Sequence, residues 1–555
     1  MIRNPIFKGF NPDPAICRKG QDLYVAVSSF EWFPGIPVYH SRDMKHWELL
    51  THVLTDDVQT DLRSLPSAKG IWAPCLTYCE TEDLFYVVYG IMRSTNARYF
   101  DVDNYLITAK DITGPWSEPV YLHSAGFDAS ILHDDDGRKY VVSMEWETRT
   151  EYEKPGVISV AEYDPGTKRI TGYPKRIWRG GTDRGCIEAP HLTKHDGRYY
   201  IMCAEGGTGY NHCVTMGRAD SVWGPYEGDP CNPIVTSVPG VSYERHDPDH
   251  LKPKYFNPDS PLQKSGHGSY VDLDNGETWL VHLCARPFVT DDPDERQRYR
   301  CTLGRETAIQ KMVWTDDGWL RMADGSNLAK LEVEPSALPD VPMPQLPSMD
   351  DFDAPELLPC YYAPRISPES FTDLASRPGW LRMRGQESRT SMNRVSILAR
   401  KLTSVDAVVT TKMEFEPDIY QHSAGLILYY DNMNYVNLRK TVIDPEKGAE
   451  ISVVQLENGE RTELLDTSVP APEGPVWMRL EIRGRESRFF WSADGETYTA
   501  IGPVFDTSKF SDEYCRYGEF TGAFVGLTCS DRMFRRKTAD FDFFEYIANE
   551  DAPVE

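Results

Sequence analysis

The sequence predicts an all-β protein built as a five-bladed β-propeller followed by a β-sandwich of the jelly-roll type. A pattern of small residues or prolines, a short apolar run and a turn recurs five times, beginning at residues 13, 72, 128, 188 and 267. Repeats spaced by roughly 60 residues and built from hairpins are typical of propeller blades. Beyond residue 360 the apolar residues alternate with polar ones and helix signals are absent, which favours an antiparallel sandwich. The alternative for the first part is an all-β domain without radial closure.

The first residues of the five copies suggest a chemical site. If each copy is the innermost strand of a blade, these first residues lie at one height around the channel and become neighbours. Three of them are carboxylates, and hydrolysis of a glycosidic bond needs one protonated carboxylic acid and one ionised carboxylate. The five first residues are Asp13, Trp72, Asp128, Glu188 and His267.

The surroundings of the three carboxylates suggest a role for each. Asp13 lies between Pro12 and Pro14, which keep its backbone extended, and we assign it as the general base. Glu188 has apolar neighbours, and desolvation raises a carboxyl pKa, so we assign it as the general acid. Asp128 is the third acid, and we expect it to tune the pKa of Glu188 and to help orient it.

Other residues are candidates for substrate binding. Trp72 can stack on a sugar ring or simply fill the channel wall. His267 can contact substrate, hold a water or bind a divalent cation such as calcium, although no companion cluster at ligand spacing accompanies it. Arg286 is expected at the mouth of the channel, with an ion pair to a channel acid as the alternative. A glycine-rich loop could bring Thr208 and His212 to the substrate.

The domain boundary is placed by composition. Residues 1–337 are assigned to the propeller, which would carry catalysis. Residues 338–359 are rich in proline and acidic residues without sustained alternation, which predicts an extended linker. Residues 360–555 are assigned to the sandwich, which we expect to close one side of the active site.

The composition limits the classes of molecule that the protein is expected to bind. A formal charge of −26 and a pI near 5.0 argue against nucleic acids and anionic membranes, and no apolar run is long enough to span a membrane. The twelve cysteines form no CxxC pair, and the N-terminus lacks an apolar leader. We therefore expect a cytoplasmic protein that acts on a small neutral carbohydrate.

Several motifs together resemble glycoside hydrolase family 43, in its β-xylosidase branch. The resemblance implies a five-bladed propeller that acts with inversion, and it implies the same roles for the three carboxylates. It also implies substrate contacts for Phe30, Trp72 and Arg286, and a phenylalanine from the sandwich in the pocket, for which Phe520 is the candidate. The sequence departs from the family at Ala189, where glycine is usual, and around Arg286. The motifs are FNPDPAI (10–16), SSFEWFPGIPVYHSRDMKHW (28–47), GFDASIL (126–132), IEAPHL (187–192), AEGGTGYNH (204–212) and LGRETAIQ (303–310).

The predicted function is an inverting exo-glycosidase that releases xylose from the non-reducing ends of short β-1,4-xylooligosaccharides. It would need no cofactor, and we expect a homo-oligomer. One alternative is α-L-arabinofuranosidase activity, as a side or main reaction. A second is a retaining fructan or sucrose hydrolase, whose NDPNG, RDP and EC motifs are absent. A third is a carbohydrate-binding propeller without turnover.

Overall fold

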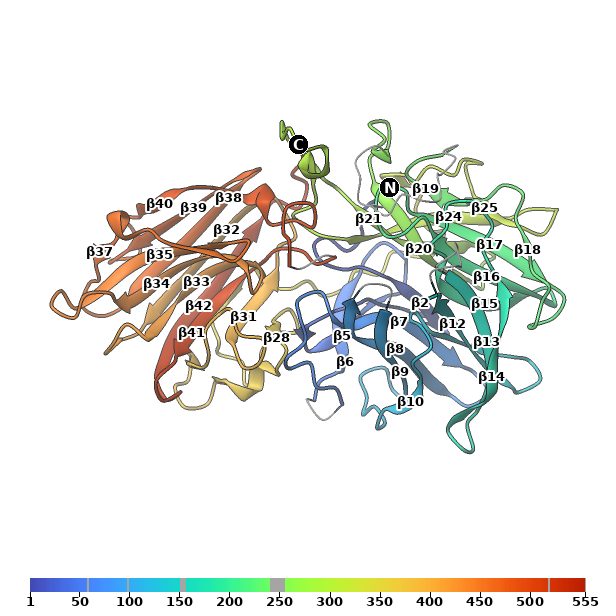
Figure 1. The fold of residues 1–555 in the computed structure, drawn as a ribbon, viewed down its shortest axis with the longest axis horizontal. Coiled ribbons are helices and arrows are strands. Elements are labelled where there is room, and N and C mark those ends of the chain that lie inside the picture. The colour runs from blue at the N-terminus through green and yellow to red at the C-terminus, as the bar shows by residue number, and fades with distance from the viewer. Residues whose placement is uncertain (57–58, 97–98, 150–155, 240–254, 518–519, 555) are drawn as a thin grey trace.

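The structure, a computed structural model, describes residues 1–56, 59–96, 99–149, 156–239, 255–517 and 520–554. Two β domains lie side by side, one drawn in blue to yellow-green and the other in orange to red (Figure 1). The helices described are 3₁₀ turns of three residues each, at Glu295–Gln297, Pro368–Ser370, Leu465–Thr467 and Thr507–Lys509. The predicted all-β class is confirmed.

The first domain is a ring of five antiparallel sheets, as the repeats predicted. The inner strands β2, β7, β11, β15 and β20 contact one another in that order, and contacts between β20 and β2 close the ring. A short strand, β19 (Val235–Thr236), adds to the fourth sheet. The five sheets, from the inner strand outward, are β2 (Ala15–Lys19), β3 (Asp22–Ala26), β5 (Gly35–Ser41) and β6 (Glu48–Leu54); β7 (Gly70–Cys79), β8 (Leu84–Asn96), β9 (Tyr99–Ala109) and β10 (Val120–His123); β11 (Ser130–His133), β12 (Lys139–Trp146), β13 (Gly156–Asp164) and β14 (Arg169–Trp178); β15 (Glu188–His195), β16 (Arg198–Glu205), β17 (Cys213–Ala219) and β18 (Glu227–Gly228); and β20 (Gln263–Asp272), β21 (Thr278–Ala285), β24 (Glu306–Trp314) and β25 (Leu320–Met322).

Three of the five inner hairpins turn at an Asp-Gly or Asn-Gly pair. Gly137, Gly197 and Gly276 have φ values of 84°, 78° and 83°. Glycine adopts this left-handed conformation without a steric penalty, which is why it follows Asp or Asn in such turns. Short strands outside the blades pair β1 (Ile2–Arg3) with β26 (Glu332–Val333) and β22 (Phe288–Val289) with β23 (Tyr299–Arg300).

The second domain is a sandwich of two antiparallel sheets. One sheet has the order β29 (Thr372–Asp373), β30 (Leu381–Arg384), β42 (Thr538–Ala548), β32 (Asp406–Glu414), β38 (Val476–Arg483), β39 (Glu486–Ser492) and β40 (Thr499–Asp506), with β27 (Met349–Asp350) paired to β42. The other has the order β31 (Ser396–Lys401), β41 (Phe524–Asp531), β33 (His422–Asp431), β34 (Asn434–Val442), β35 (Ala449–Glu457) and β36 (Glu460–Glu463), with β37 (Val469–Pro470) paired to β35. Strand β27 lies within the expected linker, 338–359, so the sandwich sheet already begins at Met349.

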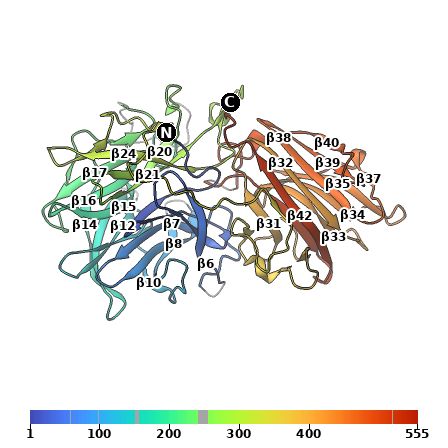
Figure 2. The ribbon, with the colours of Figure 1, turned by 180° about the vertical axis from the view of Figure 1, so that it is seen from behind.

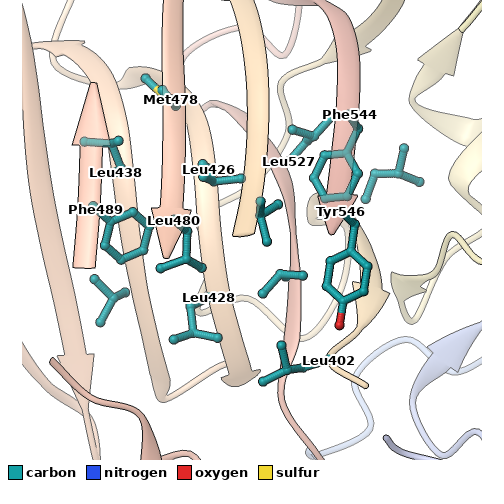
Figure 3. Packing of buried hydrophobic residues seen from close by; sticks show 14 of the residues in the cluster. Leu402, Leu426, Leu428, Leu438, Met478, Leu480, Phe489, Leu527, Phe544 and Tyr546 are labelled. Atoms are coloured by element: carbon teal, nitrogen blue, oxygen red, sulfur yellow. The ribbon is translucent and has the colours of Figure 1, made fainter. Parts of the chain in front are cut away.

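The alternation of strand side chains builds two different apolar faces on β33. Leu426 and Leu428 point between the sheets, where they pack with residues of both sheets such as Leu480, Phe489 and Leu527 (Figure 3). Successive strand residues point to opposite faces. The intervening residues Ile427 and Tyr429 are therefore free to pack against the propeller.

The domains share one buried hydrophobic cluster. Phe10, Phe30 and Trp32 of the propeller belong to it together with Ile427 and Phe524 of the sandwich. The rings of Trp32 and Phe524 stack with centroids 3.7 Å apart. Strand β4 (Trp32–Phe33) also pairs with β28 (Ala363–Pro364) across the junction. The sandwich is thus held directly against propeller segments on both sides of Asp13, at Phe10 and at residues 30–33.

None of the twelve cysteines forms a disulfide. Within the described residues, no helix has the length and apolar character to cross a membrane.

Candidate active site

The inner strands share a left-handed residue beside the channel. It is Asp13 in the first blade, Asp128 in the third and His267 in the fifth, with φ values of 57°, 54° and 52°. In the second and fourth blades it is Ala73 and Ala189, at 39° and 50°. Non-glycine residues adopt this conformation at a cost and keep it where the surroundings enforce it.

The alignment of the repeats is therefore corrected by one residue in two blades. Trp72 and Glu188 precede the left-handed residue instead of occupying it. The strand register shifts between Trp72 and Cys75 and between Glu188 and His191, as it does around His267, so the left-handed residue lies in a bulge in these three blades. An inserted residue re-aims the side chains next to it, so Glu188 reaches the channel from a different backbone position than Asp13 and Asp128.

Both oxygens of Asp13 are contacted. The Ser28 hydroxyl donates a hydrogen bond to Oδ2 at 2.7 Å, and the same hydroxyl oxygen accepts one from the Ala73 N–H at 2.7 Å. Nδ1 of His267 lies 3.4 Å from Oδ1. These contacts tie Asp13 to the second and fifth blades. Ser28 was not singled out from the sequence.

Asp128 is buried, Glu188 is partly buried, and the two interact with each other. Oδ2 of Asp128, a residue 8% exposed, accepts a hydrogen bond from the Ala189 N–H at 3.0 Å. Burial, and then the charge of Asp13, raise the pKa of Asp128 to about 8. Burial, followed by the charges of Asp128 and Asp13, raises the pKa of Glu188 well above its usual value. The structure thus brings all three predicted carboxylates into one electrostatic group.

Arg305 is the cation of this group. It opposes the other effects and lowers the pKa of Glu188. Arg305 is 1% exposed, its Nε donates to Thr208 Oγ1 at 3.0 Å, and its Nη1 pairs with Asp512 of the sandwich. The guanidinium carbon lies 4.6 Å from the centre of the Phe520 ring. Thr208 therefore lies at the site by holding Arg305.

Arg286 lies elsewhere, which departs from the expectation. Its Nε and Nη2 donate to the two carboxylate oxygens of Glu306 at 2.7 and 2.8 Å. Arg286 thus forms an ion pair, which was the alternative, but its partner is Glu306 and not one of the three carboxylates. The arginine beside Glu188 is Arg305, in the motif LGRETAIQ. The preceding Gly304 is the sequence feature that could have pointed to a close contact at this motif. A Cβ on Gly304 would lie 2.5 Å from the Thr521 carbonyl oxygen, so glycine permits the sandwich loop to approach.

Aromatic rings line the approach to the carboxylates. Trp72 packs edge-on against Phe127 and Phe520, with centroids 5.9 and 6.4 Å away, and lies 5.8 Å from Phe30. Its Nε1 donates to the Ala68 carbonyl at 3.0 Å, which fixes the ring. Phe520 was expected to reach the site from the sandwich, and its ring lies against Trp72. Phe127 was not proposed from the sequence.

The cation expected near His267 stays a prediction. Within the described ranges, the one group of three potential ligands at suitable spacing is Asp43, His46 and Asp340. In that group Asp43 Oδ2 already accepts hydrogen bonds from His46 and from the Val341 N–H. His267 is 6% exposed, and burial lowers its pKa while Asp13 opposes the shift.

A buried acid with a raised pKa, an oriented second carboxylate and an aromatic wall define the class of protein as a carbohydrate hydrolase that works by acid–base catalysis. Comparison with known proteins agrees. Residues 2–320 match the family described as glycosyl hydrolases family 43, and residues 349–547 match the β-xylosidase C-terminal concanavalin A-like domain. The chain belongs to glycosyl hydrolase family 43.

Full-length relatives share both domains. A β-xylosidase of Bacillus subtilis (strain 168) is 38% identical, over 98% of this chain and 99% of the relative. Xylosidase/arabinosidase 43B of Humicola insolens is 38% identical, over 98% of this chain and 97% of the relative. The crystal structure of a xylan β-1,4-xylosidase from Bacillus halodurans C-125 superposes with a TM-score of 0.91 at 42% identity, covering 98% of this chain and all of that one. The family assignment excludes the fructan hydrolase and the binding module without turnover as readings of this chain.

Proposed function

We propose that this enzyme removes single xylose units from the non-reducing ends of short β-1,4-linked xylooligosaccharides with inversion at the anomeric carbon. The observation that carries the proposal is the division of the carboxylates. Glu188 is partly buried and desolvation raises its pKa, whereas Asp13 is held by Ser28 and His267 beside the channel. The full-length similarity to xylosidases supports the choice of sugar.

The proposed reaction assigns one proton transfer to each carboxyl group. Protonated Glu188 donates its proton to the glycosidic oxygen as the bond to the anomeric carbon breaks. Ionised Asp13 accepts a proton from the water that attacks the opposite face of that carbon. Burial keeps Glu188 protonated, and Asp128 orients it by accepting the hydrogen bond from the Ala189 N–H; ionisation of Asp128 would disfavour ionisation of Glu188 further.

The substrate contacts follow the walls of the site. We assign Phe30, Trp72 and Phe520 to the faces of the sugar, because aromatic rings pack on apolar sugar faces. We assign Arg305 and His267 to its hydroxyl groups, since both present N–H donors next to the carboxylates. The sandwich loop that carries Phe520 would limit the length of sugar chain that can pass. We therefore assign to it the exo mode of action.

α-L-Arabinofuranosidase activity is the second candidate. The relative named xylosidase/arabinosidase 43B supports it at 38% identity over nearly the whole chain. Both reactions would use the same three carboxylates. A cytoplasmic location, favoured by the unpaired cysteines, and a homo-oligomeric assembly belong to the same proposal.

A reduced trisaccharide tests the substrate and the direction of attack. Xylotriitol should yield xylose and xylobiitol, because only the non-reducing end carries a cleavable terminal unit. The kcat/KM for xylobiose should exceed that for 4-nitrophenyl α-L-arabinofuranoside if xylose is preferred, after correction for leaving-group reactivity. Glu188→Gln should lower kcat on xylobiose by about 10²- to 10⁴-fold while leaving binding largely intact. The surface variant Glu227→Gln is the control, and equal turnover by Glu188→Gln would reject the assignment.

A further inference from the structure

A cavity of about 510 Å³ lies at the domain junction. Its lining includes none of the three carboxylates of the active site. Strands β6 of the propeller and β31 of the sandwich lie on either side of this junction (Figure 2). The walls come from the N-terminal segment, β5, β6, residues 344–348, β31 and β42. This volume is in the range of sites for small ligands.

Lys401, the last residue of β31, is a buried cation in the wall of this cavity. The residue is 8% exposed. Its Nζ donates to Asn11 Oδ1 at 2.7 Å and lies 5.0 Å from the centre of the Tyr362 ring. The same Asn11 oxygen also accepts from the Tyr39 hydroxyl at 2.7 Å. An ammonium has three N–H donors, so one neutral acceptor leaves most of its hydrogen-bonding capacity and all of its charge unmatched.

The preceding residue adds a second buried cation to the same wall. Arg400 is also 8% exposed; its Nη1 donates to the Pro347 carbonyl at 3.4 Å, and its guanidinium carbon lies 5.1 Å from the centre of the Tyr546 ring. Arg400 interacts electrostatically with Asp350, but the two form no ion pair in the part of the chain that the structure describes. The local charge of the cavity wall is therefore positive.

The carboxylates in the lining are already used. Glu48 pairs with His40 at 2.9 Å, and Glu550 pairs with Lys8 at 3.6 Å. Among the described residues Lys401 forms no ion pair with either of them. A buried charge without a partner is costly, and proteins pair such charges or shift their pKa.

The pKa of Lys401 is consistent with a buried charge that has no counter-ion. Burial lowers its pKa to about 7. The groups around it are neutral: burial lowers the pKa of His52 to about 3 and raises those of Tyr39 and Tyr362. An uncharged amine could also donate the hydrogen bond to Asn11. A bound anion would favour the charged ammonium over the neutral amine.

We propose that this junction cavity binds a small anion, a carboxylate or phosphate compound up to the size of a sugar acid, with the Lys401 ammonium as its counter-ion. Asn11 and the Tyr39 hydroxyl, which already surround the ammonium, keep it aimed. Arg400 adds to the positive potential of the wall. The proposal is independent of the substrate of the active site.

Thermal unfolding with chosen anions tests this site. The probes are sodium D-glucuronate and inorganic phosphate, with D-glucose as the uncharged control of similar size, all at constant ionic strength and pH 6.5. A ligand that binds only the folded state raises the Tm in a saturable way. We expect glucuronate, phosphate or both to raise the Tm by about 2 °C or more, and glucose to have no effect. A response to glucuronate alone identifies a sugar acid, and a response to phosphate identifies a phosphate compound.

Two variants assign the response to Lys401. Lys401→Met keeps the stem and removes the charge, and Asn11→Asp supplies an internal counter-charge, so both should abolish the shift. Lys412→Met, which removes a lysine paired with Asp542 on the sandwich, should retain it. If Lys401→Met fails to fold, Asn11→Asp decides alone. Equal shifts in wild type and variants, or no shift with either anion, would overturn the proposal.

Discussion

The Asp128 carboxylate accepts a hydrogen bond from the backbone N–H of Ala189 at 3.0 Å. Ala189 directly follows Glu188, so this bond joins the third carboxylate to the backbone of the proposed acid. Ala189 has a φ of 50°. Alanine thus adopts at this position a left-handed conformation that glycine would adopt without a steric penalty.

The raised pKa of Asp128 makes the stability of the protein depend on pH. Burial raises this pKa from 3.8 to about 8, so the folded state retains a proton that the unfolded state has lost. The resulting stabilisation is fully present below about pH 4 and is lost as the pH rises through about 8. Asp128→Asn should therefore lose less stability than wild type between pH 4 and 8, by at least about 1 kcal/mol.

Denaturant titrations at several pH values measure this difference. Asp259→Asn, a change of an exposed propeller carboxylate, is the control and should follow the wild-type curve. Parallel curves for wild type and Asp128→Asn would show that the proton on Asp128 does not favour the folded state.

The sandwich should influence the proposed acid through Arg305. Asp512 pairs with Arg305 and also accepts a hydrogen bond from the Tyr430 hydroxyl at 2.5 Å. Asp512→Asn removes the negative charge that pairs with Arg305. The uncompensated guanidinium then lowers the pKa of Glu188 further. We expect the alkaline limb of the pH profile of kcat/KM to move to lower pH and kcat/KM to fall by about tenfold or more.

Asp292→Asn is the matched control for this variant. It breaks a comparable pair with Arg300 near the same junction. A fall in kcat/KM without any movement of the alkaline limb would assign Asp512 a purely structural role.

Phe520 should contribute to substrate binding from the second domain. Its ring packs against Trp72 and under the Arg305 guanidinium. Phe520→Ala should raise the KM for xylobiose by roughly 3- to 10-fold, because an aromatic contact is worth about 0.5–1.5 kcal/mol. Steady-state kinetics measure this effect, and Phe534→Ala, which truncates an exposed ring of the same domain, should leave KM unchanged. An unaltered KM in Phe520→Ala would remove the sandwich from the binding site.

The fold could be predicted because its signals are local and repeated. The Asp-Gly turns and the alternating strands specify blades and sandwich wherever they occur. The carboxylates were found from the repeat, in which Asp13 and Asp128 share one place and Glu188 lies one residue before it. The bulges beside Trp72 and Glu188 could not be predicted, because an extra residue in a strand leaves no mark in a pattern of small and apolar residues.

The partners of the carboxylates depend on contacts between distant segments. Ser28 and Phe127 have no distinctive sequence context. The choice between Arg286 and Arg305 depended on which of them Glu306 and Asp512 would hold. Asp512 lies in the other domain, so no pattern within the propeller could indicate it.

The stereochemistry of hydrolysis tests the central claim, that Glu188 and Asp13 act on opposite faces of one sugar. Proton NMR of xylobiose hydrolysis at early times resolves the anomers of newly released xylose before mutarotation mixes them. Inversion of the β-linkage predicts that α-xylose appears first. If β-xylose appears first, the bond is cleaved with retention, and the assignment of Asp13 as the base that activates water is wrong.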